Sequence, residues 1–118
     1  MRIEFGRQTV QLIRSYSVCA EACEGGIRVV CSLSAAQTML RLGVTCIRVQ
    51  SKYGEDVETV WNTDTRRGGM TGCGCARHTV SETLRLPPGI YTAVVTLYAK
   101  SGLGSDSVTC RTEPVTIE

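Results

Sequence analysis

The chain has few aromatic residues, few prolines and a single histidine, and it lacks any long apolar run. Among its 118 residues are one Trp, one Phe, four Tyr and three Pro. No stretch approaches the roughly 20 consecutive apolar residues that a transmembrane helix needs, so we expect no membrane span. The scarcity of aromatic rings also argues against a carbohydrate site built on stacked side chains.

The chain also lacks a large excess of charge of either sign. Thirteen Lys and Arg oppose eleven Asp and Glu, which leaves a net charge of +2. This excess is too small to neutralise phosphates along a nucleic acid unless the cations gather on one face, and the sequence shows no basic stripe. We therefore expect no nucleic-acid partner. The hydrophobic and charged fractions, 42% and 20%, are those of an ordinary folded domain.

Cysteine, in contrast, is abundant, with seven residues in the chain. This is more than a cytosolic domain needs, and it favours an oxidising, extracellular compartment. Because the count is odd, at least one thiol stays free, pairs with another chain or is held by another group. Residues 1–7 contain no apolar core of a signal peptide. We expect that the export signal has been removed and Met1 supplied for expression; an intracellular protein is the alternative.

Short runs rich in Val, Ile, Thr and Tyr alternate between apolar and polar residues with a period of two, which predicts strands. Residues 36–42 are predicted to form a turn or one short helix between sheets, ended by Gly43. Residues 62–76 are predicted to form a long loop that is functional or crosses between sheets. The expected fold class is all-β, a two-sheet β-sandwich of about seven to eight antiparallel strands. The expected strands span 16–22, 27–35, 46–50, 57–61, 80–86, 91–99 and 107–117.

The first two runs should form a hairpin that turns at residues 24–25. The register that follows pairs Val18 with Cys31 and Ala20 with Val29. In this register the side chain of Cys31 points into the core, and that of Cys19 faces out.

We divide the chain into an N-terminal extension, residues 1–14, and a single β-sandwich domain, residues 15–118. The extension contains Ile3, Phe5, Val10, Leu12 and Ile13, which a seven-strand sandwich does not need for its own core. An extended apolar segment can add to an exposed sheet edge in the same or a neighbouring molecule, so we expect a homodimer or larger assembly. A frayed terminus is the alternative.

The segment Leu86-Pro87-Pro88-Gly89-Ile90-Tyr91 and the run to Val95 resemble the turn and penultimate strand of bacterial immunoglobulin-like and fibronectin type III-like domains. Tyr91 falls on the same face of this strand as Ala93 and Val95, so we expect its ring to point inward and its hydroxyl to reach the backbone of the turn. Segments 15–17, 39–43, 69–72 with His78, 91–100 and 104–107 are also similar to a family of small secreted bacterial proteins of unknown function. This resemblance implies export and an immunoglobulin-like β-sandwich, and it transfers no catalytic residue. That family is Ser- and Asn-rich around positions 73 and 75, so the two cysteines there are a local addition.

If the strand order is immunoglobulin-like, the start of the strand with Cys46 lies at the same end as the loop with Cys73 and Cys75. The first and last strands then run side by side. We expect Cys46 bonded to Cys73 or Cys75, Cys110 bonded to Cys19 or Cys23, and Cys31 a buried free thiol.

Residues 73–78 place the thiols of Cys73 and Cys75 close in sequence to the only histidine, His78. Such donors attract zinc or copper(I). Three ligands do not close a structural zinc site, and the spacing of these residues matches no zinc finger. A disulfide or a surface loop is therefore the favoured interpretation, and we expect no cofactor. Cys75 and His78 also lack a third group to orient the imidazole for nucleophilic catalysis.

Trp61, Arg66 and Arg67 are the remaining surface candidates. A lone Trp in a sandwich more often packs between sheets, or lies half-buried at an edge, than stacks on a sugar. The two arginines could bind an acidic partner, although a solvated loop tip is the usual explanation. With no catalytic constellation in sight, we expect a non-catalytic secreted or cell-surface adhesion, recognition or assembly module with a protein or cell-surface ligand. The alternative is a thiol- or metal-binding protein that uses Cys73, Cys75 and His78.

Overall fold

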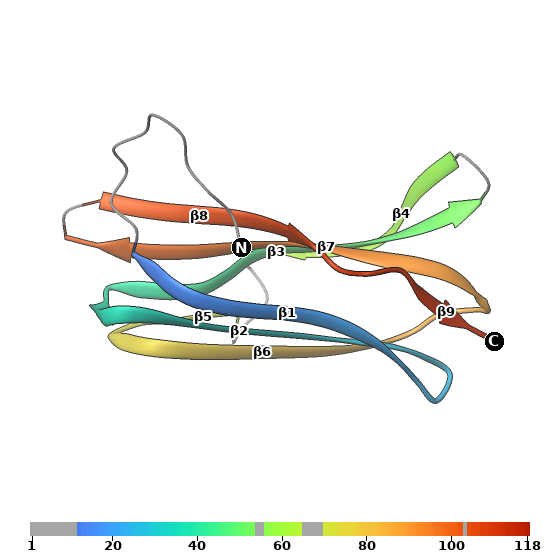
Figure 1. Ribbon diagram of the computed structural model, residues 1–118, viewed down its shortest axis with the longest axis horizontal. Coiled ribbons are helices and arrows are strands. Elements are labelled where there is room, and N and C mark those ends of the chain that lie inside the picture. Colours follow the sequence, from blue (N-terminus) through green and yellow to red (C-terminus); the bar gives the residue numbers. More distant parts are fainter. Residues whose placement is uncertain (1–11, 54–55, 65–69, 103) are drawn as a thin grey trace.

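The computed structural model describes residues 12–53, 56–64, 70–102 and 104–118, which form two antiparallel sheets and no helix. Sheet A has the order β1-β2-β6, and sheet B has the order β4-β3-β7-β8, with β5 paired to β3 and β9 paired to β7. The two sheets lie face to face (Figure 1). The prediction of an all-β, two-sheet protein is confirmed. The strands are β1 (Ile13–Cys23), β2 (Gly26–Met39), β3 (Arg41–Tyr53), β4 (Asp56–Asp64), β5 (Thr71–Gly72), β6 (Cys75–Arg85), β7 (Gly89–Ser101), β8 (Gly104–Arg111) and β9 (Val115–Ile117).

The β1–β2 hairpin has the predicted register. Val18 pairs with Cys31 and Ala20 pairs with Val29. Cys31 is fully buried and Cys19 is exposed, as the alternation requires. Gly25 supplies the turn with a φ of 74°, a conformation that glycine adopts without strain.

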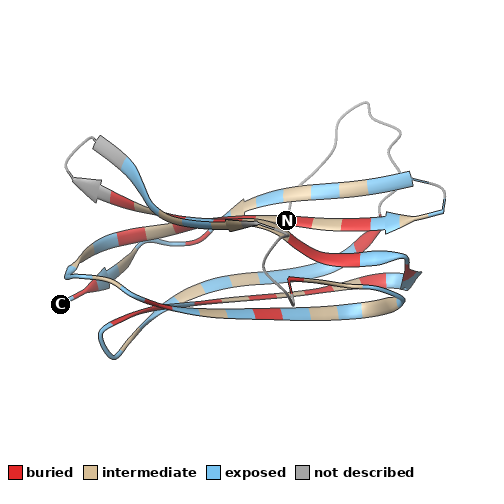
Figure 2. Cartoon of the chain, turned by 180° about the vertical axis from the view of Figure 1, so that it is seen from behind, coloured by how far each residue is buried: buried red, intermediate tan, exposed pale blue. Residues whose placement is uncertain are grey.

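The core lies between the sheets and is built from every second residue of the facing strands. Figure 2 shows buried positions recurring along these strands, between exposed and half-buried ones. β2, β3 and β7 supply most of the core because each is a central strand, paired on both sides. Their fully buried side chains include Ile27, Val29 and Cys31 from β2, Leu42, Val44, Ile47 and Val49 from β3, and Tyr91, Val95 and Leu97 from β7.

Residues 36–42 contain no helix, so that part of the prediction is wrong. β2 continues to Met39, and β3 begins at Arg41 after a single bend at Leu40. Met39 and Leu42 are buried while Leu40 is exposed, and the Leu40 amide donates a 2.8 Å hydrogen bond to the Lys100 carbonyl oxygen. Strand pairing and burial on both sides of the bend outweigh the weak helical preference of so short a segment. The predicted passage between sheets does occur here.

Residues 62–76 also pass between sheets, from β4 in sheet B to β6 in sheet A. Arg66 and Arg67 fall in the part of this segment outside the described residues. Met70 is buried in the core, and its carbonyl oxygen accepts a 2.8 Å hydrogen bond from the Val44 amide. The end of the crossing is therefore tied to β3.

The described chain begins at Leu12, which is buried in the core together with Ile13. Both amides donate hydrogen bonds to Oδ2 of Asp106 on β8, at 3.2 and 3.3 Å. These two residues, assigned above to the extension, thus belong to the sandwich. The predicted edge strand otherwise falls on residues 1–11, outside the described part. Within that part, no helix is long and apolar enough to cross a membrane.

Candidate functional site

The outer face of sheet A presents two rows of polar side chains that cross all three strands. In the first row, Ser17 pairs with Ser32, which pairs with Thr79. In the second row, Ser15 pairs with Ser34, which pairs with Arg77. Since Cys31 and Leu33 of β2 point into the core, their neighbours Ser32 and Ser34 must face solvent.

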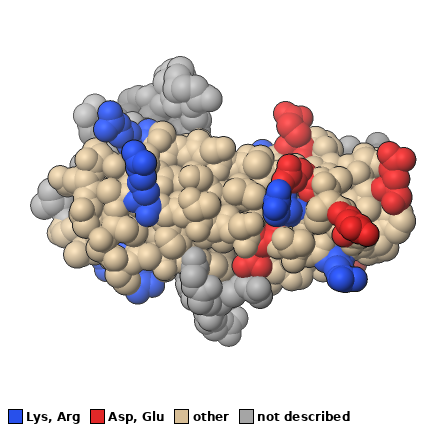
Figure 3. Space-filling view, turned by 90° about the horizontal axis from the view of Figure 1, so that it is seen from below, with Lys and Arg blue, Asp and Glu red and all other residues tan. Residues whose placement is uncertain are grey.

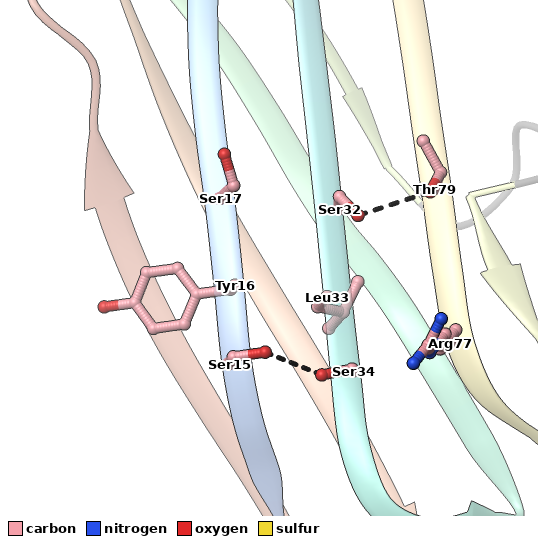
Figure 4. Close-up of a pocket in the computed structure, with 8 residues that line it drawn as sticks. All are labelled: Ser15, Tyr16, Ser17, Ser32, Leu33, Ser34, Arg77 and Thr79. Carbon is pink, nitrogen blue, oxygen red and sulfur yellow. Dashed lines mark hydrogen bonds between the residues drawn. The ribbon is translucent and has the colours of Figure 1, made fainter.

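These two rows line an open groove with a volume of about 460 Å³, which we call the serine groove. Its lining residues are Ser15, Tyr16, Ser17, Ser32, Leu33, Ser34, Arg77 and Thr79 (Figure 4). Figure 4 shows the Tyr16 ring directed away from the two rows, beyond the edge of β1. The accessible chemistry of the groove is therefore that of hydroxyls and one guanidinium.

Hydrogen bonds join neighbouring hydroxyls in the serine groove. The Oγ atoms of Ser15 and Ser34 are 2.7 Å apart, and Ser32 Oγ lies 3.4 Å from Thr79 Oγ1. A hydroxyl offers one donor and two acceptor lone pairs, so each pair keeps hydrogen-bonding capacity for a ligand. Arg77 is exposed and forms no ion pair with any residue that the structure describes. The groove can thus bind a polar ligand and orient one acidic group on it.

Figure 3 views the molecule from the side of sheet A. Basic side chains stand towards the left of this view, acidic and basic side chains are mixed across its right half, and the band between the two groups is largely uncharged. One of the charged groups is the exposed ion pair between Arg28 and Glu21, at 2.6 Å. The uncharged middle favours hydrogen bonding over electrostatic attraction on this side of the molecule.

The candidate cluster of Cys73, Cys75 and His78 is brought together only in part. A Cβ atom added to Gly72 would lie 3.0 Å from both Cys75 Sγ and His78 Nδ1, so both of these side chains lie next to this glycine. Cys73 is exposed in the turn before β6. No group of three or more His, Cys, Asp or Glu side chains that could hold a metal occurs in the described ranges.

All seven cysteines are free thiols in this structure, so neither expected disulfide pairing is formed in it. Cys110 packs against the core, whereas Cys19 is exposed at an outward position of β1. Burial, followed by the charges of Cys19 and Cys110, raises the pKa of the Cys31 thiol from 9.0 to about 12. Cys31 is therefore protonated and unreactive at neutral pH.

Trp61 on β4 is half-buried and packs against the core opposite Val49, in agreement with the packing interpretation. The serine groove was not among the sequence candidates. Its signal was present as Ser15, Ser17, Ser32 and Ser34 at alternating positions of one hairpin. Recognising it also required the register of β6 against β2, because that pairing adds Arg77 and Thr79 to the two rows.

No protein-family model, curated protein or solved structure matches this chain. No family is therefore identified for it, and its function has to be argued from its own residues.

Proposed function

We propose that this protein is a non-catalytic, secreted recognition module that binds a saccharide in the serine groove. The supporting observation is the pair of polar rows that crosses β1, β2 and β6, with five hydroxyls and the guanidinium of Arg77 on one open face. A ligand rich in hydroxyls can exchange donor and acceptor roles with such side chains.

The backbone beneath the serine groove supports this proposal because it is held rigidly. β2 is hydrogen-bonded to β1 on one side and to β6 on the other along the whole groove. Its inward residues Cys31 and Leu33 are buried in the core. Because this backbone is already held in place, it loses little conformational entropy when a ligand binds to the side chains above it.

We further propose that the sandwich is immunoglobulin-like and that the protein is exported. The first, second and sixth strands form one sheet, and β4-β3-β7-β8 form the spine of the other, an arrangement compatible with such domains. The hydrogen bond from the Tyr91 hydroxyl to the Pro87 carbonyl oxygen supports the same assignment. The cysteine content supports export.

A glycan microarray probed with the purified chain tests the proposed function, followed by calorimetry with the saccharide that binds best. Thr79→Val removes a groove hydroxyl at nearly constant shape and should weaken binding about tenfold. The matched control is Thr83→Val, another exposed outward position of β6 outside the groove, which should leave binding unchanged. Absence of any bound saccharide, or equal losses in the two variants, would contradict the proposal.

A thiol- or metal-binding role is the second candidate, and the position of Cys75 and His78 next to the same glycine, Gly72, favours it. A thiolate and an imidazole can both ligate copper(I). Metal analysis of the purified protein, with Cys75→Ser as the control, tests this role. Stoichiometric copper or zinc that the variant loses would support it, and metal-free protein that takes up neither ion would exclude it.

A further inference from the structure

The outer face of sheet B, on the opposite side of the molecule from the serine groove, gathers basic side chains from three strands. Arg48 on β3 and Arg111 on β8 both pair with Val94 of β7, so the two arginines stand in one row across the sheet. Further along the same strands, Arg41 pairs directly with Lys100. All four cationic side chains are exposed. We call this surface, defined by Arg41, Arg48, Lys100 and Arg111, the basic face.

The three strands that carry the basic face add no acidic side chain to it. Among the residues that the structure describes, the outward positions of β3, β7 and β8 carry no Asp or Glu. Asp106 of β8 instead accepts hydrogen bonds from the amides of Leu12 and Ile13, where β1 begins. Like charges directly opposite each other, as at Arg41 and Lys100, destabilise a sheet, so a bound anion would relieve this repulsion.

Contacts with uncharged neighbours hold several of these side chains in place. Val94 lies between Arg48 and Arg111 in this row, and only 6% of it is exposed although it faces outward. Arg111 donates a 3.3 Å hydrogen bond to Oε1 of Gln50, and Arg41 donates one of 3.2 Å to Oγ1 of Thr71. Neither bond neutralises a guanidinium, so both side chains are positioned and remain cationic.

Between the two cationic rows lie hydroxyl-bearing side chains. Thr96 and Thr109 pair across β7 and β8 with their hydroxyls 3.3 Å apart, and Tyr98 pairs with Ser107. The rows at residues 94 and 100 of β7 are about 20 Å apart at the usual rise per residue of a strand. An extended chain with several negative charges matches this spacing better than a small anion does.

We propose that the basic face binds a linear anionic polysaccharide whose charge is carried by carboxylate groups. Three of the four cations are arginines, whose planar fork matches a carboxylate, and the hydroxyls between the rows suit the hydroxyls of a sugar chain. A single-stranded nucleic acid fits less well, because Tyr98 is the one aromatic ring among the outward positions in these rows and base recognition relies on stacking. This interaction is independent of the ligand proposed for the serine groove.

The test compares binding of the full chain to linear polygalacturonate and to its fully methyl-esterified form, which has the same backbone without the charge. The charged polymer should bind with an affinity that falls steeply as salt is added, and the ester should not bind measurably. The double variant Arg48→Gln, Arg111→Gln should bind the charged polymer at least about tenfold more weakly. The control Arg28→Gln, Arg85→Gln makes the same change in net charge on the outer face of sheet A and should lose less than about twofold.

Thermal unfolding of both double variants establishes that each is folded before binding is compared. Equal affinity for the polymer and its ester, or equal losses in the two double variants, would overturn the proposal. Tighter binding of a single-stranded polynucleotide or of polyphosphate than of polygalacturonate would overturn it as well. Thr79→Val should leave polygalacturonate binding unchanged, so failure of the serine groove and failure of the basic face can be told apart.

Discussion

The hydroxyl of Tyr91 donates a 2.7 Å hydrogen bond to the carbonyl oxygen of Pro87, four residues earlier in the chain. The Tyr91 ring is buried at the start of β7 and lies over Gly89, where an added Cβ atom would be 3.3 Å from the hydroxyl. One side chain thereby ties the turn at residues 87–89 to the core. The inward direction of the ring and the reach of its hydroxyl are both as predicted from the parity of the strand.

Replacing Tyr91 should therefore destabilise the protein strongly. Tyr91→Ala should lower the free energy of unfolding by about 3–5 kcal/mol, because it removes a fully buried ring. Tyr91→Phe should lower it by about 1 kcal/mol, because only the hydrogen bond is lost. Tyr98→Ala, at a half-buried position on the opposite face of β7, should cost much less. Urea titrations measure all three, and equal losses for the two alanine variants would contradict the inward assignment of Tyr91.

Asp106 should contribute to stability by anchoring the start of β1. Asp106→Ala leaves the amides of Leu12 and Ile13 without their acceptor, and should lower the free energy of unfolding by about 1–3 kcal/mol. Ser107→Ala, at the next and outward-facing position of β8, is the control and should change stability by less than about 0.5 kcal/mol. Hydrogen exchange should show faster exchange of the Leu12 and Ile13 amides in the Asp106 variant alone. Unchanged exchange would show that the carboxylate does not hold this end of the strand.

Cys31 should make the stability of the reduced protein fall at alkaline pH. Its folded-state pKa is raised from 9.0 to about 12, so between these values the unfolded chain has lost a proton that the folded chain keeps. The contribution is fully present below pH 9 and is lost as the pH rises towards 12. Other groups titrate in the same range, so the informative quantity is the difference between wild type and Cys31→Ala. A fall in stability of the same steepness in both proteins would rule out the assigned role of Cys31.

The seven thiols should differ in reactivity. In the reduced, folded protein at neutral pH, Cys19 and Cys73 are exposed and should react rapidly with a thiol reagent, whereas Cys31 should react only after unfolding. Mass spectrometry of trypsin-digested, alkylated protein resolves the individual sites. Rapid labelling of Cys31 in folded protein would contradict its burial.

A non-reducing peptide map of protein secreted into an oxidising medium tests the disulfide pairings. We expect Cys46 joined to Cys73 or Cys75, and Cys110 joined to Cys19 or Cys23. Each unstrained bridge of this loop length should add about 3–4 kcal/mol to stability. Seven free thiols in protein isolated without reductant would contradict both the pairings and the proposed export.

The properties that could be predicted from the sequence are those set by near neighbours in the chain. A period of two assigns each strand residue to one face, which is why the inward directions of Cys31 and Tyr91 could be predicted. A tight turn links the two halves of a hairpin, so the register of Val18 against Cys31 followed from the position of Gly25. The helix considered for residues 36–42 was wrong because the pairing partners of Met39 and Leu42 lie more than thirty residues away, at Cys75 and Ala99.

The two proposed surfaces depend on which strands become neighbours, and only the tertiary structure decides that. Ser32 and Ser34 could be placed on an outer face from alternation alone, but Thr79 and Arg77 join them through the pairing of β2 with β6. In the same way, the basic face exists because β7 lies between β3 and β8, which brings Arg48 and Arg111 into one row. The sequence by itself determined the all-β class and the direction of the side chains in the regularly alternating strands, since these follow from local backbone geometry. The assembly of those side chains into a groove and a basic face was decided by long-range strand pairing, because that pairing is set by burial of the whole core rather than by any one segment.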